Sequence, residues 1–145
     1  MKQLHKYGFL TLAMVFGLSM IGSAAQETRF RARLSPMPVT PQTVDSITGG
    51  GEVHATLNGT VLSIAGSFRG TSSVATAAHV HNGPKAIPGP PVHPLEVTNA
   101  TSGDIHGELD LTPEQVEAFN NEALYIQVHT ETNPGGELRG WLLPE

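Results

Sequence analysis

Seven histidines are spread along the chain, and three of them fall within AAHVHNGPKAIPGPPVHPL, residues 77–95. His79 and His81 are separated by one residue, so on a β-strand their side chains share a face, roughly 6.5–7 Å apart along the chain. His129 lies in a later alternating segment, and His93 lies in the proline-rich part of the first one. Because imidazole nitrogens bind copper, zinc, iron and nickel, these four histidines form a candidate metal site.

The ligand types narrow the choice of metal. The chain has no cysteine, and no group of carboxylates accompanies the histidines, so copper or zinc is favoured over iron or nickel. The alternative is a set of solvated or hydrogen-bonded histidines, which is the more common fate of a single H-x-H pair in a strand. Spacing alone leaves both interpretations open. His54 is expected to be an exposed residue, and His106 remains ambiguous.

Cations are scarce in most of the chain. From Leu34 onward only Arg69, Lys85 and Arg139 carry a positive charge, whereas the chain as a whole has 13 acidic and 8 basic residues. Arg139 is one of these few cations. From the residues alone its simplest role is an ion pair with Glu131 or Glu137, worth about 0.2–1 kcal/mol if exposed.

The elements that must position these residues are short strands. Alternating apolar and polar side chains, typical of strands, occur at residues 30–34 and 124–130. Another candidate strand, at residues 75–81, ends at the turn residues Asn82-Gly83-Pro84. Asn58-Gly59 lies between two further alternating runs and predicts a hairpin. We also expect strands at 106–111 and 137–143, whereas residues 82–94 hold five prolines and two glycines and are expected to form a loop.

One segment predicts a helix. Thr112-Pro113-Glu114-Gln115 offers an N-cap hydroxyl, a proline at the first helical position and a glutamine three residues after the cap, which together form a capping box. Seven or so strands with one short helix predict an all-β fold. From the residues alone we expect an antiparallel β-sandwich or barrel.

The N-terminal residues 1–25 are expected to form a cleaved signal peptide. Lys2 and Lys6 precede an apolar run, and small residues end at Ala25. Residues 26–145 would then form one domain that is secreted or periplasmic, without a stable membrane anchor. The acidic balance argues against nucleic acid as a partner.

Four segments of the chain resemble the CHRD (chordin-type) domain family: FRARLSP, AAHVHNGP, GELDLTPEQ and LYIQVHTETNPGGELRGWL. The last is the most specific, because a strand ending in VHT, an N-P-G-G turn and E-L-R-G rarely occur together. The resemblance covers the mature chain and implies an extracellular module with an all-β, immunoglobulin-like or Greek-key β-sandwich, so we expect the sandwich rather than the barrel. It implies little about activity.

A weaker similarity is to copper/zinc superoxide dismutase. It rests on the order of HVH, a Gly-Pro loop with a histidine, VHT, and a Gly-rich turn with a late arginine. The resemblance implies that His79, His81 and His129 bind copper and that Arg139 guides superoxide, with His93 in the loop role. The matching zinc histidines and the cysteine pair of that family are absent, so it implies a single-metal site.

Together these observations give one leading hypothesis and two rivals. The first is a secreted protein with a mononuclear histidine copper site that dismutates superoxide or acts on another small anion. The second is a non-catalytic module that binds an extracellular protein partner, and the third is a metal carrier without turnover.

Overall fold

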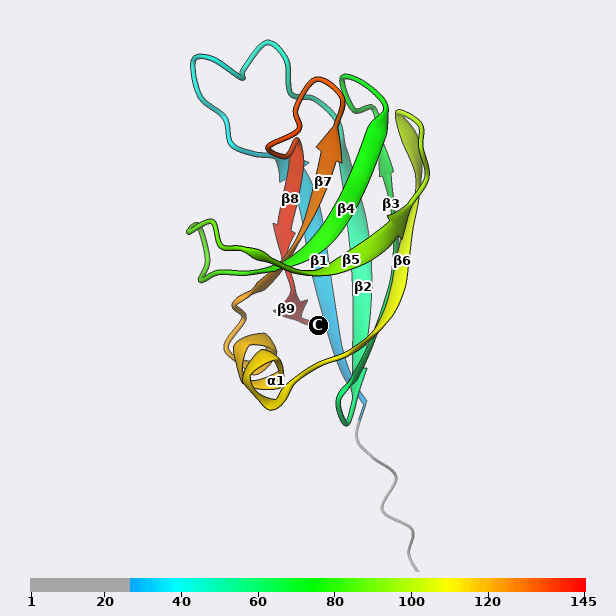
Figure 1. Cartoon of the computed structure of the whole chain (residues 1–145), viewed down its shortest axis with the longest axis vertical. Helices are drawn as coiled ribbons and strands as arrows, with labels where there is room; N and C mark the ends of the chain where they lie inside the picture. The colour runs from blue at the N-terminus through cyan, green and yellow to red at the C-terminus, as the bar shows by residue number, and fades with distance from the viewer. Residues whose placement is uncertain (1–26) are drawn as a thin grey trace, which may run out of the picture.

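The computed structural model describes residues 27–145, and the predicted signal peptide at residues 1–25 lies outside this range. This part of the chain forms strands and one helix (Figure 1): β1 (Thr28–Pro36), β2 (Gly50–Asn58), β3 (Val61–Arg69), β4 (Ala75–Asn82), β5 (Pro91–Val97), β6 (Ser102–Asp110), α1 (Pro113–Asn120), β7 (Leu124–Thr130), β8 (Leu138–Trp141) and β9 (Leu143–Pro144). The prediction of an all-β fold with one short helix is confirmed.

The strands close into an antiparallel barrel, which corrects the predicted Greek-key sandwich. Their order is β2-β3-β6-β5-β4-β7-β8-β1, and β1 pairs back onto β2. The closure depends on β1: residues 28–34 pair with β2, and Ser35 and Pro36 continue onto β8. A strand that pairs on both sides leaves no gap between two sheets, so the eight strands enclose one core, and the short β9 adds to β1.

Strand β5 was missed by the sequence prediction, which placed a loop at residues 82–94. Its prolines are tolerated because this part of the strand has one hydrogen-bonded neighbour. Pro91 and Pro94 lie where β5 pairs only with β4, and pairing with β6 begins at Glu96. A proline lacks the backbone N–H, so it fits a strand where that donor is not needed, as at a sheet edge.

The predicted hairpin is confirmed. Strands β2 and β3 pair in register from Gly50–Arg69 to Asn58–Val61, and Gly59 takes a φ of 64° in the turn. Alternate side chains of these and the other strands point inward and are almost completely buried. They form one continuous core that includes Val53, Leu62, Val80, Ile105, Ile126 and Leu138.

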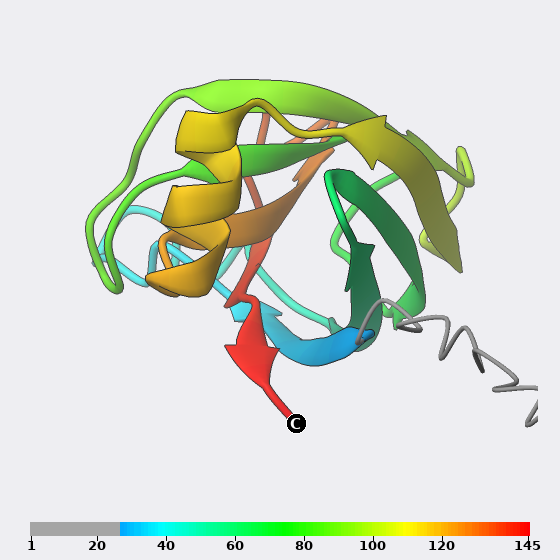
Figure 2. The same cartoon turned by 90° about the horizontal axis from the view of Figure 1, so that it is seen from below.

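Helix α1 lies at one end of the barrel, as Figure 2 shows. The predicted capping box is present: the Thr112 hydroxyl accepts from the Gln115 backbone N–H, and the Gln115 side chain accepts from the Thr112 N–H. Phe119 is fully buried and its ring centroid lies 4.0 Å from that of Phe30 in β1. In the described residues, no helix is long and apolar enough to cross a membrane.

Candidate metal centre

Two neighbouring strands carry the three histidines that come together. In β4, Val80 points into the core, so His79 and His81 on either side of it point outward. Strand β7 pairs antiparallel with β4 and places His129 directly opposite Ala77, two residues before His79. The small side chain of Ala77 leaves room for the His129 ring to lean toward the two histidines of β4.

Two of the three rings are held in one tautomer by backbone carbonyls. His81 Nδ1 lies 2.9 Å from the Gly89 carbonyl oxygen, and His129 Nδ1 lies 2.9 Å from that of Pro134. A carbonyl can only accept, so Nδ1 must carry the proton in both rings. The lone pair of each Nε2 is therefore free, which is how a protein commonly prepares a histidine to bind a metal.

The free nitrogens converge. Nε2 of His81, Nε2 of His129 and Nδ1 of His79 are buried and have no hydrogen-bond partner. The ligand atoms of the three residues lie within 4.8 Å of one another, and the His79–His129 ring centroids are 5.0 Å apart. Ligands of one ion with bonds of about 2.0–2.1 Å lie about 3.3–3.6 Å apart, so modest side-chain rotations would complete the site. The three histidines thus fit a metal ion.

The electrostatics of the cluster favour neutral imidazoles. Burial lowers the pKa of His79, and the nearby His129 lowers it further. Burial also lowers the pKa of His81; its hydrogen bond to Gly89 acts in the opposite direction, but His129, His79 and Arg139 add to the lowering. Because only a neutral imidazole can bind a metal, these shifts keep the ligands available toward lower pH.

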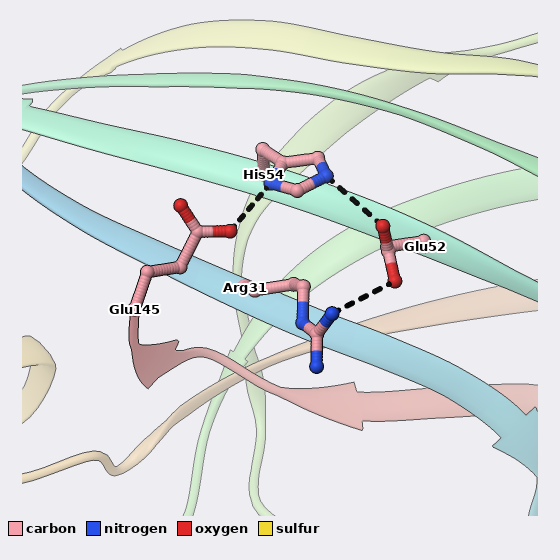
Figure 3. A network of polar contacts seen from close by, with 4 residues as sticks. All are labelled: Arg31, Glu52, His54 and Glu145. Atoms are coloured by element: carbon pink, nitrogen blue, oxygen red, sulfur yellow. Dashed lines mark hydrogen bonds and ion pairs between the residues drawn. The ribbon is translucent and has the colours of Figure 1, made fainter.

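The structure does not bring His93 into this cluster. His93 lies opposite Val80, whose side chain points into the core, and its Nε2 is 2.9 Å from Gln115 Oε1 of α1. His54, expected to be exposed, contacts Glu52 and Glu145, as Figure 3 shows, and His106 contacts Glu96. Within residues 27–145 only His79, His81 and His129 form a group that could hold a metal.

Arg139 lies beside the cluster but is buried, with 7% of its surface exposed. Its guanidinium donates through Nε and Nη2 to Gln127 Oε1, and its Cζ lies 5.0 Å from the ring centroid of Tyr125. The Tyr125 ring stacks on His81 with centroids 4.8 Å apart. Arg139 forms no ion pair with Glu131 or Glu137, and among the described residues its guanidinium contacts an amide oxygen and two aromatic rings.

A family model described as the CHRD domain matches residues 30–142. The chain belongs to the CHRD domain family. No curated protein and no solved structure matches it. All three clustered histidines and Arg139 fall within the matched residues, so the candidate metal centre is part of the CHRD domain itself.

The outer face of β7 in this CHRD domain is buried, although its alternating sequence is typical of a strand with one polar, exposed face. Tyr125 and Gln127 alternate with apolar residues, yet each is only 1% exposed. The Tyr125 hydroxyl bonds to Gly89, and Trp141 Nε1 donates to the Gly83 carbonyl. Aromatic residues on this face and Gly-Pro segments after β4 and β7 were the signals that loops fold back over it.

Gln127 connects Arg139 to the loop that holds His129. Its Oε1 accepts from Arg139, and its Nε2 donates to the Gly135 carbonyl at 2.7 Å. The preceding carbonyl, of Pro134, fixes the His129 tautomer. Gln127 is therefore a support of the metal centre that spacing could not identify, because its partner is a backbone atom in a turn.

Replacing Gly136 by alanine should disturb this support. Gly136 has a φ of 112°, and a Cβ there would lie 1.4 Å from Gln127 Nε2. The unfavourable backbone conformation alone costs about 1–3 kcal/mol. We expect a lower melting temperature and weaker copper binding, measured by thermal unfolding and by titration.

Gly135→Ala is the matched control, since a Cβ at Gly135 meets nothing within 4 Å and that residue has no positive φ. Equal stability and equal copper affinity of the two variants would contradict a role of Gly136 in making room for Gln127.

Proposed function

We propose that this CHRD domain binds one copper ion through His79, His81 and His129. The observation that carries the proposal is the set of three buried imidazole nitrogens that converge without any hydrogen-bond partner. A buried polar atom without a partner costs about 1–3 kcal/mol, so three in one place require an explanation, which a metal ion provides. Copper is preferred because imidazole-only sites suit it and it binds most strongly among the divalent first-row metals.

A location outside the cytoplasm accompanies this proposal. Two observations support it. Residues 1–25 have the pattern of a signal peptide, and the chain belongs to the CHRD family, in which extracellular modules are expected. Metal analysis of protein purified from the exported fraction tests the site and its identity together. We expect one copper per chain. If the protein contains zinc instead, the metal site stands but its metal is zinc. If it contains no metal, the non-catalytic binding module is favoured.

Superoxide dismutation is the activity that we propose for the loaded site. Three protein ligands leave a coordination position open, and copper, when bound, supplies the cycling between two oxidation states. The chain contributes neutral imidazoles and the fixed positive charge of Arg139, which lies near enough to lower the pKa of His81. Cations beside a site can raise the association rate of an anion 10-fold or more.

Replacing Arg139 by glutamine should slow turnover while the metal content stays near that of the wild type. Arg139→Lys should be milder, because it keeps the charge. Rising ionic strength should slow the wild-type protein more than Arg139→Gln, because salt weakens the attraction between Arg139 and the approaching anion. At 0.1–0.15 M salt, charges farther apart than about 8–10 Å are largely screened from each other. The measurement is superoxide decay with protein of known copper occupancy.

Free copper under the same conditions is the reference for this assay, because it also dismutates superoxide. A loaded protein no faster than the free ion would remove the enzymatic role and leave metal carriage. An Arg139→Gln variant as fast as the wild type at equal occupancy would remove the role of Arg139 alone.

A further inference from the structure

A hollow of about 710 Å³ lies on the outer face of the barrel where β1, β2 and β3 run side by side. Its lining includes Arg33 and Ser35 of β1, Gly50 of β2, and Ser67 and Arg69 of β3. In the ring of eight strands, β2 and β3 lie opposite β4 and β7. The hollow is therefore on the other side of the barrel from the histidine cluster, and the proposed metal site does not use it.

The hollow lies where β2, the middle strand, has a glycine in place of an outward side chain. Gly50 pairs with Arg69 of β3, and a Cβ at Gly50 would meet only the Leu34 carbonyl, at 3.4 Å, so the space above this position is open. Arg33 of β1 pairs with Glu52, two residues along β2 from Gly50. Arg33 and Arg69 therefore lie diagonally across β2, separated by two strand spacings of about 4.7–4.9 Å each and by two residues along the strands.

Arg33 does not form an ion pair with Glu52, the acidic residue opposite it in the sheet. Glu52 is its direct cross-strand neighbour. However, Glu52 turns toward Arg31, with N and O atoms 3.5 Å apart, and toward His54, whose Nε2 is 3.1 Å from it (Figure 3). His54 in turn contacts the C-terminal residue Glu145 at 2.8 Å. This network occupies Glu52 and leaves the exposed Arg33 guanidinium without an acidic partner in the part of the chain that the structure describes.

The same holds for Arg69. Among residues 27–145, Arg29 pairs with Glu27, Arg31 with Glu52 and Lys85 with Glu122, whereas Arg139 is buried against Gln127. Neither Arg33 nor Arg69 has a carboxylate within 4.0 Å or a hydrogen bond from its side chain in this range. On a chain with a net charge of −5, the two exposed cations that have no acidic partner among the described residues line one hollow.

We propose that this hollow binds a tetrahedral oxyanion group, of the kind carried by phosphate and sulfate esters. Each guanidinium presents a planar fork of N–H donors that fits two oxygens at once. A carboxylate has two oxygens and satisfies one fork, whereas a tetrahedral group has at least three and can contact both arginines. Gly50 provides the room for the group between them, and Ser67 adds a hydroxyl to the same lining.

The test is a calorimetric titration of the purified protein, at low ionic strength, with inorganic phosphate, glycerol phosphate and glucose 6-sulfate. We expect saturable binding that weakens as salt is added, and the two esters distinguish a phosphorylated from a sulfated ligand. Arg33→Gln and Arg69→Gln should each weaken binding at least about five-fold, because each removes charge-assisted hydrogen bonds. Gly50→Leu should block the hollow without changing its charge.

Three controls make the result specific. Arg29→Gln removes an exposed cation of the same strand that lies outside the hollow, and it should bind like the wild type. His81→Ala should also bind normally, which separates this site from anion binding at a metal. Acetate should bind more weakly than phosphate. The proposal is overturned if the wild type binds none of the three anions, or if Arg29→Gln loses as much affinity as Arg33→Gln while circular dichroism shows all variants folded.

Discussion

Replacing His81 by alanine is expected to reduce copper affinity by more than 100-fold. His81 supplies one of the three converging nitrogens, and its ring is fixed by the Gly89 carbonyl. Loss of an outer-shell hydrogen bond to a ligand alone often costs about 10–100-fold, so loss of the ligand itself should cost more. The measurement is a competition titration with a chelator of known copper affinity, on wild-type and variant protein at the same pH.

Two other histidines serve as controls. His54→Ala removes a histidine that contacts Glu52 and Glu145, far around the barrel from the cluster. His93→Ala removes one whose Nε2 contacts Gln115 of α1. Both should bind copper as the wild type does. If His81→Ala also binds copper with unchanged affinity, the three histidines are not the ligands; if His93→Ala alone loses affinity, the loop histidine is a ligand after all.

The second large effect concerns Glu137, which is completely buried. Its carboxylate accepts hydrogen bonds from the backbone N–H groups of Thr48 and Ser72, from the hydroxyls of Ser72 and Thr130, and from the Asn133 amide. These contacts join the residue before β8 to two segments distant in sequence, at Thr48 and Ser72, and to the nearby turn after β7. Glu137→Ala should lower the free energy of unfolding by about 3–4 kcal/mol, since it leaves several buried donors without an acceptor.

Glu137→Gln should be milder, at about 1–2 kcal/mol, because its amide oxygen keeps an acceptor while the charge is lost. Urea unfolding measures both variants. Glu131→Gln is the control, since Glu131 is exposed, and it should leave stability unchanged. If Glu137→Ala is as stable as Glu131→Gln, the buried hydrogen bonds contribute nothing net to folding.

Glu137 also makes stability depend on pH. Burial acts to raise its pKa, but the hydrogen bonds from Thr130, Ser72 and Thr48 outweigh it and hold the pKa below the ordinary value of 4.5. The unfolded chain therefore takes up this proton at a higher pH than the folded protein does. The contribution of Glu137 is complete above about pH 4.5 and is lost as pH falls through the lowered pKa, so Glu137→Gln should show a shallower acid dependence.

The sequence predicted the local features of the fold well. The capping box at Thr112, the hairpin at Asn58-Gly59 and the shared face of His79 and His81 depend on residues close in the chain, and the structure confirms them. Barrel closure depends on which strands pair across long separations, and short strands with similar alternation do not encode this pairing locally. Strand β5 was missed because its prolines suit a strand only where one neighbour is absent.

The candidate site was predictable only in its ligands. The pairing of Ala77 with His129 brings β7 beside β4, and no local pattern specifies that pairing. Gly89, Pro134 and Gln127 contribute through backbone carbonyls or loop contacts, for which residue type gives little signal. The burial of Glu137 could not be predicted for the same reason. Its neighbours in the sequence are typical of a surface turn, and its five hydrogen-bond donors, from Thr48, Ser72, Thr130 and Asn133, converge only in the folded chain.

The closure of the barrel through β1 bears on when the protein can fold. Ser35 and Pro36, near the start of the domain, must pair with Arg139 and Leu138, near its end. Until the last residues are available, β1 can pair only with β2, and the edge that later receives β8 stays open. Contacts so distant in sequence slow folding, because the chain must close a large loop before they form. The domain would thus remain incompletely folded until β8 is available to pair with β1.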